Sequence, residues 1–292
     1  MVHRLIPVLV VIGCGGGAST PGEPVEIIGR DWTIAPGTEQ YKCIGIQVDH
    51  DMTISRFQTE NPIGEHHVVL TVTDQLGGYG GTKLGEYDCS VLTLDLNMLF
   101  ASGVGTDSMD MPDGIGLEVK AGQYLNLNLH LFNTTDGPLT GHSGIVATPM
   151  DPVAPDHQAE MIFAGTTNIS IAPGQTATVG GGCTFQKDAT VFTYWPHMHQ
   201  HATHQKVTLT QGGVATAIHD ADFSFSEQKN YPLSPMLQIH AGDSLRTDCT
   251  YTNNDTTTLT FGDSSTAEMC FTGLYRYPKQ AVSLFECTEG HP

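Results

Sequence analysis

Short runs of alternating apolar and polar residues, separated by turn residues, extend along the chain from Val25 onward. The clearest run covers residues 124–130, Tyr-Leu-Asn-Leu-Asn-Leu-His, in which leucine takes every second position. Successive side chains of a β-strand point to opposite faces. This segment therefore predicts a strand with three leucines on one face and Asn126, Asn128 and His130 on the other.

Similar short runs occur in both halves of the chain, and no segment shows the period of an amphipathic helix of three or more turns. Charged residues make up only 15% of the chain, whereas glycine is abundant, which is typical of short strands joined by many turns. We predict an all-β fold built from antiparallel β-sandwiches. The other predicted strands lie at residues 44–48, 67–72, 176–179, 190–194, 206–210 and 257–261.

The strand pattern is interrupted once, by a segment rich in proline and aspartate at residues 147–157. A chain of 292 residues is longer than one compact core usually organises. Such a segment is a typical domain boundary. We predict an N-terminal domain at residues 25–150 and a C-terminal domain at residues 151–292, both preceded by a signal and tether at residues 1–24.

The first residues have the features of an export signal. A short basic start is followed by an apolar run, residues 5–12, that is too short to span a bilayer. Val11-Ile-Gly-Cys14 then resembles a bacterial lipobox, and residues 15–24 form a Gly/Ser/Pro-rich tether. We expect an exported lipoprotein of the bacterial cell envelope or surface, held to the membrane only by a lipid on Cys14. The alternative is a cleaved signal peptide and full secretion.

The cysteine count agrees with export. Of seven cysteines, six remain once Cys14 is set aside, and an even number in an exported chain indicates disulfides. Pairing within each half gives Cys43 with Cys89. The remaining four cysteines form two further bridges whose partners the count leaves open.

The balance of charges bears on partners. The chain has 12 basic and 31 acidic side chains and a net charge of −19. Such a surface repels nucleic acid and anionic lipid headgroups, so we expect no nucleic-acid partner. Acidity alone identifies no ligand.

Histidine is the outlier in composition, with 14 residues, several of them clustered. His66 and His67 are adjacent, so both can serve one metal only at a strand end or bulge, which Gly64 favours. His197 and His199 share one face if they lie on a strand, which makes a two-ligand unit for copper or zinc.

Each cluster also has a simpler interpretation. Adjacent histidines arise by chance, and the second cluster could be a solvated, histidine-rich edge or loop. His201 shares the face of His197 and His199 only if the strand continues, and neither His201 nor His204 has an assigned role.

Taken together, these motifs resemble the copper type II ascorbate-dependent monooxygenases, which include the peptidylglycine α-hydroxylating and dopamine β-hydroxylating enzymes. The family has a His-His pair completed by a later histidine, and here His130 follows His67 by 63 positions. Its second domain has His-x-His completed by methionine in Glu-Met-Cys, and here Met269 of Glu268-Met-Cys270 follows His197 by 72 positions.

The resemblance implies two jelly-roll-like domains with one copper ion each, thus two per chain. It assigns an electron-transfer copper to His66, His67 and His130, and an oxygen-activating copper, with catalytic ligands, to His197, His199 and Met269. It implies hydroxylation of an activated C–H bond of a small-molecule substrate, with O2 and ascorbate or another one-electron reductant. It also implies the bridges Cys43–Cys89, Cys249–Cys270 and Cys183–Cys287. The alternative function is a non-catalytic surface copper protein for storage, scavenging or delivery.

The chain departs from the peptide-amidating members where they bind the substrate carboxylate. Those enzymes use an arginine two residues before His-x-His, and an asparagine and a tyrosine two and four residues after the methionine. Trp195, Phe271 and Gly273 stand at these positions here. We therefore expect Trp195 and Phe271 to line a pocket for a neutral or aromatic substrate. Arg276 lies nearby in sequence, and we expect it to form a surface ion pair.

Overall fold

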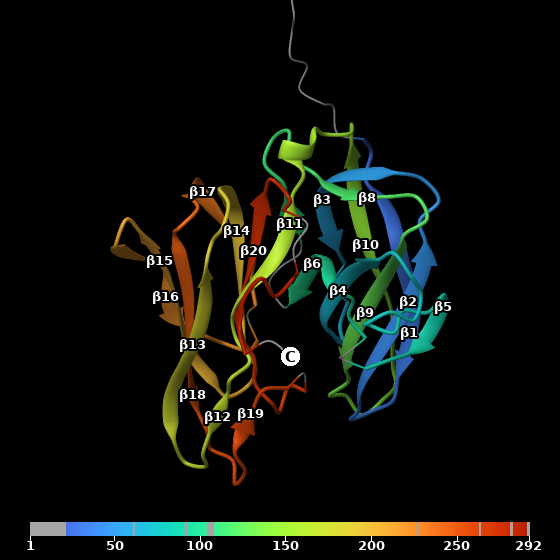
Figure 1. Cartoon of the computed structure of the whole chain (residues 1–292). Helices are drawn as coiled ribbons and strands as arrows, with labels where there is room; N and C mark the ends of the chain where they lie inside the picture. Colours follow the sequence, from blue (N-terminus) through green and yellow to red (C-terminus); the bar gives the residue numbers. More distant parts are fainter. Residues whose placement is uncertain are drawn as a thin grey trace, which may run out of the picture.

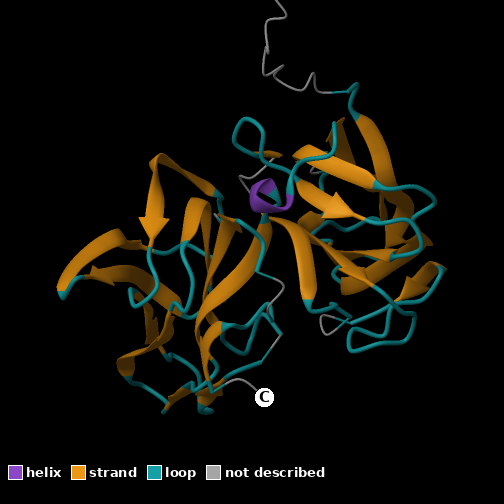
Figure 2. Ribbon diagram, turned by 45° about the horizontal axis from the view of Figure 1, so that its top comes forward, coloured by secondary structure: helices purple, strands orange, loops and turns teal. Residues whose placement is uncertain are grey.

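The computed structural model describes residues 22–60, 62–90, 93–103, 108–226, 228–262, 264–280 and 283–290. Over these residues the chain is almost entirely β, with one 3-10 helix, η1 (Pro155–His157). Figures 1 and 2 show two lobes of strands side by side, joined near this helix. The prediction of an all-β fold with two antiparallel jelly-roll-like sandwiches is confirmed. Among the described residues, no helix is long and apolar enough to cross a membrane.

The N-terminal sandwich consists of two five-stranded sheets. The first has the order β1 (Val25–Ile34), β10 (Leu139–Met150), β3 (Met52–Thr59), β7 (Ser108–Asp110), with β8 (Leu117–Val119) also paired to β3. The second has the order β5 (Gly85–Asp88), β2 (Glu39–Gln47), β9 (Tyr124–Phe132), β4 (Glu65–Thr73), β6 (Asn97–Gly103).

The C-terminal sandwich has a five-stranded and a four-stranded sheet and a short strand pair. The five-stranded sheet has the order β17 (Tyr231–Ile239), β14 (Ala189–His197), β20 (Cys270–Tyr277), β11 (Glu160–Thr166), β21 (Cys287–Glu289), and its β11–β21 pair is parallel. The four-stranded sheet has the order β13 (Thr176–Thr184), β18 (Ser244–Thr252), β15 (Ala202–Gln211), β16 (Val214–Asp222). The short pair is β12 (Ser170–Ile171) with β19 (Leu259–Thr260).

Disulfides tie sheets and loops together. Cys43–Cys89 joins β2 to the residue after β5. Cys183–Cys287 and Cys249–Cys270 each join the two sheets of the C-terminal sandwich. These are the three pairs that the family resemblance implies.

Strand β9 is buried on both faces, including the face that carries its polar residues. Leu125, Leu127 and Leu129 are fully buried in the core, but Asn126 and Asn128 on the opposite face are buried too. Their side-chain amides donate to the carbonyl of Thr93, at 2.9 and 3.2 Å. The polar face of this strand therefore does not face solvent; it binds the loop that contains Thr93.

The two sandwiches pack through apolar side chains. A single cluster of buried residues runs from the N-terminal core into β11, β14 and β20 of the C-terminal sandwich, where it includes Met161, Phe163, Trp195, Phe271 and Tyr275. Figure 1 shows β6 and β11 at this junction. Because burial of apolar area dominates folding energetics, this junction couples the two sandwiches.

Each sandwich carries one of the two tryptophans, Trp32 on β1 and Trp195 on β14. We expect the urea unfolding curve of each single-tryptophan variant, Trp32→Phe and Trp195→Phe, to have the same midpoint by fluorescence and by circular dichroism. The reason is that the shared apolar cluster makes unfolding one cooperative event. Each curve is compared with the circular-dichroism curve of the same variant. Two midpoints that differ between probes within either variant would show that the sandwiches unfold independently.

Candidate metal centres

A β-bulge presents His66 and His67 to one point. Gly64 has a φ of +99°, and its carbonyl accepts from the N–H of Phe132 at 2.7 Å. The register between β4 and β9 then shifts, so that Glu65 pairs with Leu131 and His67 with His130. His66 is the extra residue, so adjacent histidines need not point to opposite faces. The strand irregularity expected at Gly64 is confirmed.

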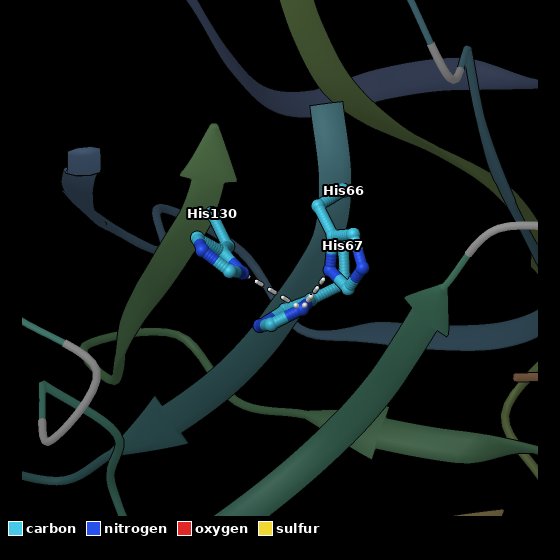
Figure 3. Close-up of side chains that lie close together, drawn as sticks. All are labelled: His66, His67 and His130. Atoms are coloured by element: carbon cyan, nitrogen blue, oxygen red, sulfur yellow. Dashed lines mark hydrogen bonds between the residues drawn. The ribbon is translucent and has the colours of Figure 1, made fainter. Parts of the chain in front are cut away.

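The three histidines of the first cluster converge through their Nδ1 atoms (Figure 3). The Nδ1 of His67 lies 3.1 Å from that of His66 and 3.3 Å from that of His130. The Nε2 of His130 contacts the Glu39 carboxylate at 2.5 Å, and the ring of Tyr41 stacks on His130 at 4.4 Å. Since a carboxylate accepts, the Nε2 of His130 carries the proton, which leaves its Nδ1 lone pair for the centre.

The second cluster lies where β14 ends. His197 is the last residue of the strand and His199 follows in the loop. The buried carboxylate of Glu268 accepts from the backbone N–H of His199 at 3.0 Å and of His201 at 2.7 Å. It thereby fixes the loop next to Met269. The strand does not continue to His201: β14 ends at His197, and the next strand, β15, begins at Ala202.

Hydrogen bonds also determine which ring nitrogen of each histidine in this cluster is free to bind a metal. The Nδ1 of His197 contacts the side-chain oxygen of Gln228 at 2.8 Å, and that of His199 contacts the carbonyl of Ala267 at 3.1 Å. Both partners are acceptors, so Nδ1 carries the proton and Nε2 is free to bind a metal. The first cluster thus offers Nδ1 and the second Nε2.

All five histidines are held neutral, which is the form that binds metals. Burial lowers the pKa of His197 to about 3 and the pKa of His66 and His199 to about 4. Burial also lowers the pKa of His67 and of His130. Near neutral pH their lone pairs are therefore available without loss of a proton.

The other histidines of the second motif have ordinary partners. His201 lies 3.3 Å from the carboxylate of Asp255 and His204 lies 3.1 Å from that of Asp220, and both carboxylates are about half exposed. Neither takes part in the convergence around His197 and His199.

Phe225 lies between the two clusters. Its ring stacks on His66 at 4.7 Å and meets the edge of His199 at 6.3 Å. Because both values are distances between ring centroids, the centroids of the His66 and His199 rings can be no further apart than their sum. The two clusters, which are more than 60 residues apart in sequence, face each other across the junction of the sandwiches.

One cavity of about 300 Å³ touches both clusters. It is lined by His67 of the first and by His197, His199 and Met269 of the second. The rest of the lining is mainly apolar and includes the aromatic residues Phe163, Trp195, Phe261, Phe271 and Phe285. Phe163 stacks on Phe271 at 5.0 Å, and Trp195 stacks on His197 at 4.6 Å. Volume and lining fit a small, largely apolar molecule.

Two residues considered for substrate binding are accounted for. A side chain at Gly273 would displace the end of the Met161 side chain, because a Cβ there would lie 2.4 Å from its terminal methyl carbon. The expectation of a surface ion pair for Arg276 is wrong. Arg276 is fully buried and pairs with Glu160 at 2.8 Å and with Glu286. Its charge is compensated by these carboxylates, so it supplies no free cation for a substrate.

The surroundings of the clusters include residues that sequence patterns did not identify. Glu39 lies 91 positions from His130 and is brought to it only by the register of β2 with β9. Gln228 and Phe225 lie in a loop and belong to no motif. Glu268 is adjacent to Met269 in the sequence motif, but its hydrogen bonds to the loop that carries His199 are seen only in the folded structure.

Comparison with known proteins gives a family match and relatives that include two DBH-like monooxygenase proteins. Residues 157–292 match the family described as "Copper type II ascorbate-dependent monooxygenase, C-terminal domain". The chain is 26% identical over 277 residues to DBH-like monooxygenase protein 1 of Gallus gallus, covering 83% of this chain and 42% of that protein. It is 23% identical over 242 residues to a DBH-like monooxygenase protein 2 of Homo sapiens, covering 75% and 48%. The chain thus spans less than half the length of these relatives.

Among solved structures, the STIV MCP is similar at a TM-score of 0.36 and 10% identity, covering 85% of this chain and 95% of that one. A likeness at this level carries no information on function.

The contact between Glu39 and His130 can be tested directly. We expect Glu39→Ala to weaken copper binding at the first cluster roughly 10- to 100-fold, because loss of the outer partner releases the orientation of a ligand ring. Competition titration with a chromophoric chelator measures the affinity. Asp88→Ala, which removes an exposed carboxylate on the adjacent strand β5, is the control. Equal affinities in Glu39→Ala and the parent would rule out this role.

Proposed function

The chain belongs to the copper type II ascorbate-dependent monooxygenases through its residues 157–292, and from this premise we propose that it is a two-copper monooxygenase. It hydroxylates an activated C–H bond of a small, neutral or aromatic substrate, with O2 and an external one-electron reductant such as ascorbate. The observation that carries the proposal is the cavity shared by His67, His197, His199 and Met269.

The donor sets fit copper. The first cluster offers three neutral imidazoles whose ligand atoms lie within 4.8 Å of one another. The second offers two imidazoles and the thioether of Met269, a soft donor that suits copper better than zinc. When bound at both sites, copper would supply the one-electron redox chemistry and the activation of O2.

The residues of the chain have separate tasks in this proposal. Glu39 and Gln228 hold His130 and His197 in the tautomers that expose a lone pair. Glu268 holds the His199 loop next to Met269, the residue directly before β20. Trp195 and Phe271 form part of the apolar wall and keep water from the space next to His197.

The substrate class follows from what the wall lacks. The arginine that binds carboxylate in peptide-amidating members is replaced by Trp195, and Arg276 is neutralised by its own ion pairs. The described wall has no lysine or arginine, so an anionic substrate would be buried here without a cationic side chain to pair with it.

The disulfides and the family indicate an exported protein. We further propose that it is a bacterial cell-envelope lipoprotein anchored through Cys14, which lies outside the described residues. The motif Val11-Ile-Gly-Cys14 supports this proposal.

The two-copper proposal predicts the metal count. We expect two copper ions per parent chain, and one each in His130→Ala and in Met269→Ile, because each change removes a ligand from a different cluster. Elemental analysis after dialysis measures the count. His157→Ala, which removes an exposed histidine, is the control and keeps both ions. A count unaffected by both ligand changes would contradict the two sites.

Catalysis is distinguished from copper storage by oxygen use. With ascorbate present, we expect the parent to consume O2 faster when an aromatic substrate is added, and Met269→Ile to lose this increase. An oxygen electrode measures the rate. Tight binding of two copper ions with no substrate-dependent O2 consumption would favour a protein for copper storage, scavenging or delivery.

The anchor is tested in a bacterial host by labelling with radioactive palmitate. We expect the full chain to carry the label and to sediment with membranes, and Cys14→Ser to lose both properties, because the thiol is the site of lipid attachment. An unlabelled parent found in the medium would indicate a cleaved signal peptide.

A further inference from the structure

We propose that Phe225, which belongs to the C-terminal sandwich, positions the His66 ring of the first cluster, so that full copper affinity there requires both sandwiches. The three histidines of this cluster all lie on strands of the N-terminal sandwich. Phe225 lies in the connection between β16 and β17 of the other sandwich. This inference rests on the proposed function only in taking the first cluster as a copper site.

His66 differs from His130 in how its ring is held. The Nε2 of His130 donates to the carboxylate of Glu39. The described structure gives the His66 ring a hydrogen-bond partner only inside the cluster, the Nδ1 of His67 at 3.1 Å. Outside the cluster, the His66 ring is stacked on the ring of Phe225, with centroids 4.7 Å apart and an interplanar angle of 28°. An outer partner that orients a ligand ring raises metal affinity, and for His66 this partner is the stacked phenyl ring.

The connection between β16 and β17 is seated on the N-terminal sandwich beside the first cluster. In the register of β4 with β6, His67 pairs with Gly103. A Cβ at Gly103 would lie 3.0 Å from the Cβ of Gln228, which is closer than an ordinary contact between carbon atoms. The amide of Asn230 also donates to the carbonyl of Ala101 at 3.3 Å. The strand next to the first cluster therefore fixes the place of this connection.

The same connection also holds the second cluster. The side-chain oxygen of Gln228 accepts from the Nδ1 of His197 at 2.8 Å, and its amide donates to the carbonyl of Phe225 at 3.4 Å. The Phe225 ring makes a T-shaped contact with His199, with centroids 6.3 Å apart. One connection thus orients ligand rings in both clusters, and a change at Phe225 reaches a metal centre whose ligands all belong to the other sandwich.

The test is copper affinity at the first cluster alone, measured in the Met269→Ile background, which removes a ligand of the second cluster. Phe225→Leu and Phe225→Met keep apolar volume but remove the flat ring. We expect both to weaken copper binding roughly 10- to 100-fold, as for the loss of an outer partner of a ligand. Phe225→Tyr keeps the ring and should bind copper as tightly as the background does. Competition titration with a chromophoric chelator measures each affinity.

A spectroscopic signature separates ring orientation from a general loss of packing. Electron paramagnetic resonance of Cu(II) at the first cluster should show altered hyperfine coupling in Phe225→Leu, because the coupling depends on ligand geometry, and the background spectrum in Phe225→Tyr. Tyr231→Leu is the control. It removes a partly exposed ring of β17 that stacks on Tyr194, and should change neither affinity nor spectrum. The urea midpoint by circular dichroism shows that each variant is folded.

Two results would overturn the inference. The first is background affinity and spectrum in Phe225→Leu and Phe225→Met, which would show that the His66 ring needs no aromatic partner. The second is a loss in Phe225→Tyr as large as in Phe225→Leu, which would show that the ring is not what orients the ligand.

The outcomes also separate this inference from the proposed function. Weakened first-cluster binding in Phe225→Leu, in a chain that shows no substrate-dependent O2 consumption, would uphold the role of Phe225 and reject the monooxygenase. Unchanged binding in a chain that holds two copper ions and consumes O2 with substrate would reject this role and leave the monooxygenase standing. No copper at the first cluster of the Met269→Ile chain would reject both.

Discussion

The apolar junction between the two sandwiches is the constraint on which the site depends. Met161, Phe163 and Tyr275 are buried in the same cluster as the N-terminal core, so the second sandwich is held against the first by burial of apolar area. Each histidine cluster is built within its own sandwich. Only the junction makes them face each other, with Phe225 in contact with both and one cavity reaching both.

Within each sandwich, the clusters are positioned by local departures from regular strand geometry. At the first, the bulge after Gly64 turns two adjacent imidazoles to one point, which a regular strand forbids. At the second, the strand ends at His197 and the loop beyond it is fixed by the buried carboxylate of Glu268. The sheets thus hold the backbone of each cluster in place, and the bulge and the strand end determine where the histidine side chains point.

The same hydrogen bonds that orient the rings also decide their chemistry. Glu39 accepts a hydrogen bond from the Nε2–H of His130, whereas Gln228 and Ala267 accept hydrogen bonds from the Nδ1–H groups of His197 and His199. The first centre is therefore built on Nδ1 donors and the second on Nε2 donors with a thioether. The different donor sets of the two clusters fit the division between electron supply and oxygen activation that we propose.

The sequence by itself determined the strand content, the six cysteines available for pairing besides Cys14 and the residue types of both clusters, because side-chain periodicity and motif spacing are local properties. It also indicated the irregularity at Gly64. It did not show that the polar face of β9 is buried, that Arg276 is enclosed by two carboxylates, or that Glu39 contacts His130 from 91 positions away. The tertiary structure decided these points, as it decided which side chains line the cavity, because they depend on strand register and on packing between segments far apart in the chain.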